Sequence, residues 1–130
     1  MRIFKNKVFN KWAEDLLTDD SLLEAAKEIV DGNYEAPLGK KVYKKRVALD
    51  GAGKRGGSRI IVAYQEGSNL FFLYAFKKNA QGNISDKDKK GLQELARIYL
   101  SLSEKELNKE VKDGRLFEIK IEQEPDENND

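Results

Sequence analysis

The fold is decided by two apolar strands joined by a short turn, in residues 59–76, which read RIIVAYQEGSNLFFLYAF. Aliphatic residues fill 60–63, and aliphatic and aromatic residues fill 70–76. Short, dense apolar runs of this kind are typical of strands buried in a sheet. Residues 66–69, EGSN, have the composition of a hairpin turn. The stretch therefore predicts two antiparallel neighbours, the second in a central position that is covered on at least one face.

The residues on either side of this hairpin predict further strands and flanking helices. Alternation of apolar and charged side chains predicts strands, and apolar residues three, four and seven apart, preceded by Ser or Thr caps, predict helices. The expected strands cover 42–49, 59–65, 69–76 and 116–121, the last at a sheet edge, and the expected helices cover 12–30 with a break near 18–20, 85–102 and 103–112. This order predicts an α+β domain whose helices pack against a central antiparallel sheet.

Length and composition narrow the class of protein. The 130 residues, 39% hydrophobic and 36% charged, fit a single domain with its own core over 1–121. Residues 122–130, EQEPDENND, form an acidic tail that we expect to be disordered. The absence of Cys and His removes disulfides, thiolate metal sites and the usual general base, so we expect no metal and no cofactor. No apolar run suits a signal peptide or a membrane span, so a cytoplasmic location is expected.

Positive charge is concentrated in one segment although the whole chain has a formal charge of only +1. Between residues 40 and 59 only Asp50 opposes the cations. These are Lys40, Lys41, Lys44, Lys45, Arg46, Lys54, Arg55 and Arg59. Such a concentration favours a local anionic partner, with a phosphate backbone as the leading candidate. The glycines at 51, 53, 56 and 57 lack the spacing of a nucleotide-binding P-loop, so we interpret them as a hairpin loop.

The expected strands would bring several of these cations together. Lys44 and Arg46 are two residues apart and share a face, and Arg59 begins the next strand of an antiparallel pair. Lys77 and Lys78 follow the end of the third strand. The alternative is an ordinary solvated sheet face. The acidic residues are interpreted as solvated helix surfaces and tail.

Aromatic residues accompany the cations on the same strands. They are Tyr43, Tyr64, Tyr74 and Phe76, and core packing is the alternative for each. Tyr64 follows the apolar run of its strand and could keep its hydroxyl near the basic residues. A surface that combines aromatic and cationic side chains can stack bases and bind phosphates.

Three segments together resemble a known family. Residues 54–64, KRGGSRIIVAY, 70–79, LFFLYAFKKN, and 83–85, NIS, resemble the RelE/HigB-like toxins of bacterial type II toxin–antitoxin systems, in the RelE/ParE superfamily. The similarity covers roughly residues 38–103. It implies a compact α+β domain that enters the ribosome and cuts mRNA by attack of a ribose 2′-OH on the adjacent phosphate, without a metal. It also implies a cognate antitoxin, with a helix-turn-helix, as partner.

The resemblance also implies roles for individual residues. Arg59 would clamp the phosphate in the transition state, and Arg46 and Lys54 would orient the substrate or help to activate the 2′-OH. Tyr64 or Tyr74 would move protons, and Lys78 takes the position of a further functional cation. The remaining cations would bind RNA; they are Lys44, Lys45, Arg55 and Lys77. Two alternatives stay open: a non-catalytic module that binds nucleic acid or protein, and a gyrase-targeting, ParE-like toxin.

Overall fold

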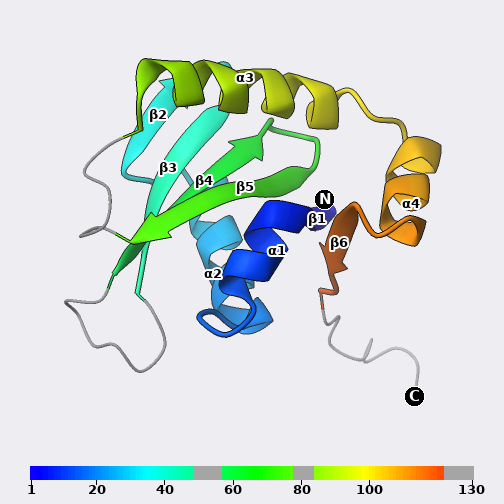
Figure 1. The fold of residues 1–130 in the computed structure, drawn as a ribbon, viewed down its shortest axis with the longest axis horizontal. Coiled ribbons are helices and arrows are strands. Elements are labelled where there is room, and N and C mark those ends of the chain that lie inside the picture. The colour runs from blue at the N-terminus through cyan, green and yellow to red at the C-terminus, as the bar shows by residue number, and fades with distance from the viewer. Residues whose placement is uncertain (49–56, 78–83, 122–130) are drawn as a thin grey trace.

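The computed structural model describes residues 1–48, 57–77 and 84–121, which form three layers with a sheet in the middle (Figure 1). The strands are β1 (Ile3–Asn6), β2 (Ala36–Gly39), β3 (Val42–Val47), β4 (Ser58–Tyr64), β5 (Leu70–Lys77) and β6 (Leu116–Ile119). The helices are α1 (Lys7–Ala13), α2 (Asp19–Val30), α3 (Asp86–Leu100) and α4 (Glu104–Lys112). The predicted α+β class, with helices packed against a sheet, is confirmed. The predicted tail at 122–130 lies outside the described residues.

The sheet has the order β2-β3-β4-β5-β1-β6. Strands β3, β4 and β5 are antiparallel neighbours, as the sequence predicts, and β6 is an edge strand. Strand β1 lies parallel to β5, with Ile3 opposite Leu70, and antiparallel to β6. The sheet is therefore mixed. Strands β1 and β2 were not predicted, because each has only four residues and neither shows a clear alternation.

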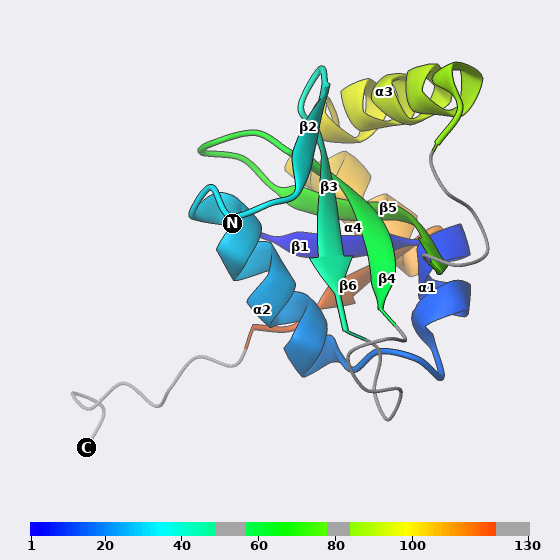
Figure 2. The same cartoon turned by 90° about the vertical axis from the view of Figure 1, so that its left-hand side faces the viewer.

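The two faces of the sheet are covered by different helices. Helices α1 and α2 pack on one face, where Phe9 and Ile29 meet Phe72 in a buried core. Helices α3 and α4 pack on the other, where Leu92 and Leu107 belong to a second core. Figure 2 shows α2 and α3 on opposite sides of the sheet. Burial on both faces explains why β5 consists almost entirely of apolar residues.

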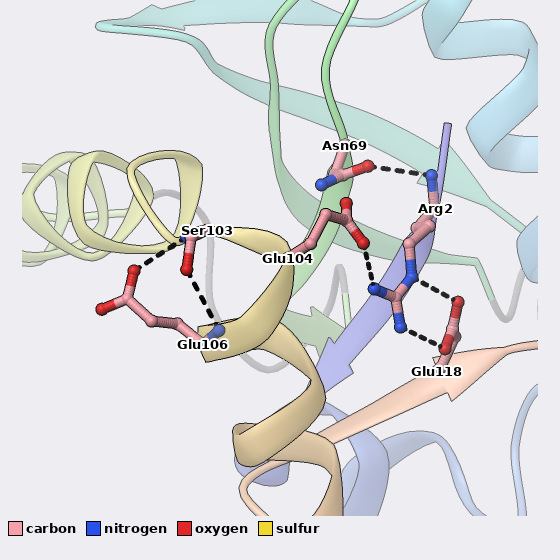
Figure 3. A network of polar contacts seen from close by, with 6 residues as sticks. All are labelled: Arg2, Asn69, Ser103, Glu104, Glu106 and Glu118. Atoms are coloured by element: carbon pink, nitrogen blue, oxygen red, sulfur yellow. Dashed lines mark hydrogen bonds and ion pairs between the residues drawn. The ribbon is translucent and has the colours of Figure 1, made fainter.

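Helix starts follow the capping residues in the sequence. Thr18 caps α2, which confirms the predicted break near 18–20, and Ser85 caps α3. Ser103 and Glu106 form the predicted capping box of α4 (Figure 3). The first helix begins at Lys7 rather than at residue 12, because the buried Asn6 side chain accepts a hydrogen bond from the Phe9 amide and caps it there.

Arg2 joins the two ends of the described chain (Figure 3). Its guanidinium donates to both carboxylate oxygens of Glu118 on β6, at 2.9 and 2.8 Å, and to Glu104 on α4 at 2.6 Å. Its backbone amide donates to Asn69 at 2.9 Å, and the guanidinium lies over the Phe4 ring. These contacts lock β1 between β5 and β6. Within the described ranges, no helix is both long enough and apolar enough to cross a membrane.

Candidate active site

Three basic residues of β3 and β4 share one face of the sheet, which we call the cationic face: Lys44, Arg46 and Arg59. Arg46 lies directly opposite Arg59 in the ladder. The sequence predicts that Arg59 lies across from Lys44 and Arg46, without the register. Lys44 lies two residues from Arg46 and opposite Ile61. Because Ile61 belongs to the core under α3 and α4, the cationic face is on the α3 side of the sheet.

A carboxylate that the sequence analysis did not single out connects two of these residues. Glu35 precedes β2, and its carboxylate lies 2.9 Å from Arg59 Nε and 3.3 Å from Lys44 Nζ. Burial raises the pKa of Glu35, but the hydrogen bonds and charges of Arg59 and Lys44 outweigh burial and hold that pKa below its ordinary value. Glu35 is thus exposed, as the acidic residues were expected to be, but it also pairs with two cations of the cationic face.

Arg59 is held in place by Glu35 and is largely buried. Its side chain is only 12% exposed. Within the described part of the chain, its Nη1 atom is buried and has no hydrogen-bond partner. An unpaired buried donor is costly, and an anionic oxygen is the acceptor that a guanidinium favours most. Arg46, directly opposite, is exposed. One largely buried and one exposed arginine therefore lie side by side in the ladder.

Other predicted residues lie elsewhere. Lys45 points to the α2 side of the sheet, where it is buried and its Nζ atom lies 3.3 Å from Glu28. Lys77 is exposed at the end of β5, opposite Ser58 and one residue out of phase with Arg59. Lys54, Arg55 and Lys78 lie outside the described residues.

The two tyrosine candidates differ in position. Tyr64 is five residues beyond Arg59 on β4, about 17 Å away along the strand, and it packs against the core on the α2 side. Tyr74 on β5 lies opposite Ile61 and packs against the α3-side core. Tyr74 therefore shares the cationic face, and the structure does not bring Tyr64 to it.

Comparison with known proteins agrees with this architecture. The family described as "RelE toxin of RelE / RelB toxin-antitoxin system" matches residues 1–119, which include β1, β2 and β6 as well as the cationic face. No curated protein matches the chain. Because the family match spans nearly all of the sequence, this chain belongs to the RelE toxin family and is the toxin component of a toxin–antitoxin system, with an antitoxin as its partner.

Proposed function

We propose that this toxin is an endoribonuclease that cuts mRNA on the ribosome and so stops translation. Toxins of the RelE family are generally endoribonucleases. The observation that supports the proposal most is the Arg59 guanidinium, directly opposite an exposed Arg46. Glu35 anchors it, and its buried Nη1 atom has no hydrogen-bond partner among the described residues. Two arginines in this relation can bind the non-bridging oxygens of one phosphate.

The proposed reaction is an in-line attack by the RNA itself. The ribose 2′-oxygen attacks the adjacent phosphorus and loses its proton. The bond from phosphorus to the 5′-oxygen of the next nucleotide breaks, and that oxygen takes up a proton. The products are a 2′,3′-cyclic phosphate and a 5′-hydroxyl. Negative charge grows on the non-bridging oxygens, and Arg59 with Arg46 would stabilise it.

Proton transfer has to use groups other than His. The proposed carriers are Lys54, Lys78 and a tyrosine. Of the two tyrosines, Tyr74 is favoured because it shares the cationic face with Arg59. Lys44, with Arg55 and Lys77, would bind phosphates on either side of the cut. Lys45 could contact RNA only after leaving Glu28 and the other face of the sheet.

The test is cleavage of a reporter mRNA in a cell-free bacterial translation extract, mapped by primer extension. Replacing Arg59 with alanine should slow cleavage about 10²- to 10³-fold, as expected for loss of a transition-state donor. Arg59→Lys should recover only part of the rate, because lysine lacks the planar fork. Arg115→Ala is the matched control, since Arg115 is exposed in the turn before β6. Circular dichroism and a thermal melt would show that each variant is folded.

Two results would contradict the proposal. Intact mRNA at high toxin concentration, in an extract that still translates, would exclude an endoribonuclease. Unchanged cleavage by Arg59→Ala would exclude the cationic face as its site. In the first case, a DNA supercoiling assay with gyrase would test the ParE-like alternative, and RNA binding without cleavage would indicate a non-catalytic module.

A further inference from the structure

A second basic region lies at the opposite end of β3 from Arg46. The β2–β3 turn stands beside α3 (Figure 2), and between them is a groove of about 730 Å³. We call it the turn groove. Four cations and one carboxylate line it, which gives a net charge of +3 over the described lining; these residues are Lys40, Lys41, Lys90, Arg97 and Glu94. None of the four cations belongs to the cationic face.

The turn that carries two of these lysines has an unfavourable backbone. Lys40 and Lys41 have φ angles of +53° and +69°, and they form the two-residue connection between β2 and β3. Two successive left-handed residues are the mark of a type I′ turn, which favours Asn, Asp and Gly. Both lysines are exposed, so packing does not offset the strain. Strained residues of this kind tend to occur where function requires their side chains.

The turn is held against α3 by a specific contact. The side-chain amide of Gln93 on α3 donates to the Leu38 carbonyl oxygen at 2.7 Å. Gly39, also at positive φ, leaves room for it, because a Cβ atom there would lie 3.1 Å from Gln93 Nε2. The lysines are therefore fixed at the rim of the groove.

We propose that the turn groove binds the phosphate backbone of RNA, on the same strand that crosses the cationic face. The claim that one RNA strand crosses both regions rests on the proposed function. Both regions lie on the α3 side of the sheet, and the five steps along the strand from Lys41 to Arg46 span about 17 Å. A single strand of RNA covers that distance with a few successive phosphates. The groove thus extends the RNA footprint well beyond the site of cleavage.

The lining favours a phosphate backbone over a protein helix. Among the described lining residues only Leu100 is apolar, and the others are charged, amide or hydroxyl side chains. A docked amphipathic helix needs several apolar anchors spaced three and four residues apart. A polyanion needs only the cations, whose binding strength depends on the salt concentration.

The test uses a variant that suits the turn better than the natural residues. Lys40→Asn combined with Lys41→Gly supplies the residues that a type I′ turn favours and removes two charges. Binding is measured by fluorescence anisotropy with labelled RNAs of about 2 and about 12 nucleotides, over a range of salt concentrations. The control is Lys105→Gln with Lys112→Gln, two exposed lysines of α4.

We expect the variant to melt at the wild-type temperature or above, so that any loss of binding is not unfolding. The longer RNA should bind the variant roughly tenfold more weakly than it binds wild type at about 0.15 M salt. The slope of log K against log salt should be smaller by about 1.4 in the variant. The shorter RNA and the control variant should bind as before.

An unchanged slope and affinity for the longer RNA would overturn the proposal. It would also be overturned if the variant lost binding to an acidic peptide such as oligo-glutamate but kept its affinity for RNA. Anisotropy needs neither ribosomes nor cleavage. Wild-type protein that binds the longer RNA through the groove but cuts no mRNA would therefore refute the proposed function and not the groove.

Discussion

Replacing Glu35 with alanine tests whether one carboxylate both stabilises the sheet and neutralises part of the cationic face. Glu35 accepts from Arg59 Nε at 2.9 Å and lies 3.3 Å from Lys44 Nζ. The variant would leave both cations without this acceptor while they remain largely buried, with side chains 12% and 18% exposed. It should therefore lose stability and, at the same time, gain affinity for RNA.

The loss of stability follows from the burial of the Arg59 and Lys44 side chains. Truncating one partner of a buried ion pair costs about 3–5 kcal/mol, and an exposed pair contributes about 0–1 kcal/mol. The Glu35 side chain is 32% exposed, which places the pair between these limits. We expect Glu35→Ala to lower the free energy of unfolding by about 2 kcal/mol, or roughly 8 °C in melting temperature. Glu35→Gln, which keeps an oxygen acceptor for Arg59, should cost about half as much.

The gain in RNA affinity follows from the charge. Without the carboxylate, Arg59 and Lys44 offer one more uncompensated positive charge to phosphate. The slope of log K against log salt should become steeper by about 0.7, and RNA should bind several-fold more tightly at low salt. Glu14→Ala, an exposed acid just beyond α1, is the control that changes the net charge equally.

The pH dependence of the free energy of unfolding distinguishes the ion pair of Glu35 from other consequences of the substitution. Since the pKa of Glu35 is lowered in the folded protein, its contribution is fully present above the unfolded value of about 4.3 and is lost as the pH falls through the folded value. Urea denaturation should therefore show a difference between wild type and Glu35→Gln at pH 7 that shrinks in acid. Equal stability of wild type and Glu35→Ala at pH 7, together with equal RNA salt slopes, would refute this reasoning.

Three further predictions concern stability. Arg2→Met should cost about 2–3 kcal/mol in urea denaturation at pH 7; the Arg2 hydrogen bond chiefly lowers the pKa of Glu118, so this difference should shrink below about pH 4. Asn6→Ala removes the bonds to the Phe9 amide and the Leu73 carbonyl at a buried position and should cost about 2–4 kcal/mol; an unchanged thermal melt would contradict this. Ser103→Ala should cost about 1 kcal/mol and speed amide exchange in the first turn of α4; unchanged exchange there would count against the capping role.

The strands in the middle of the sheet could be predicted from the local sequence pattern alone. Residues 59–76 combine dense apolar runs with a turn, and once they pair as a hairpin the preceding alternating strand has one natural place beside them. Strand β1 could not be placed in this way. Its four residues carry no periodic signal, and its position depends on pairing with β5 and β6, more than 60 and 110 residues away respectively.

Some features of the candidate site could likewise be predicted from the sequence, and others needed the structure. Period-two alternation puts Lys44 and Arg46 on one face, and antiparallel pairing puts Arg59 across from them. That Arg46 is the direct partner of Arg59 needs the register of the structure. Alternation alone also places Tyr64 on the opposite face from Arg59, because five residues separate them, so this sequence-based expectation could have been refined before the structure was known. The position of Tyr74 needs the register, which shifts at a bulge between Ile61 and Val62.

The functional features that the sequence did not predict lie in and around β2. Glu35 precedes this strand and the strained Lys40-Lys41 turn follows it, so both features depend on pairing between β2 and β3. That pairing puts a carboxylate on Arg59 and Lys44 at one end and sets two lysines against α3 at the other. The positive charge that reads as one continuous run in the sequence is thus divided. One part is partly neutralised by Glu35 and anchored for chemistry. The other lines a groove that keeps a net positive charge despite Glu94, and it is placed for binding. Substitutions at the two ends of β2 should therefore change RNA affinity and cleavage to different extents. With a single basic patch, the two quantities would change together.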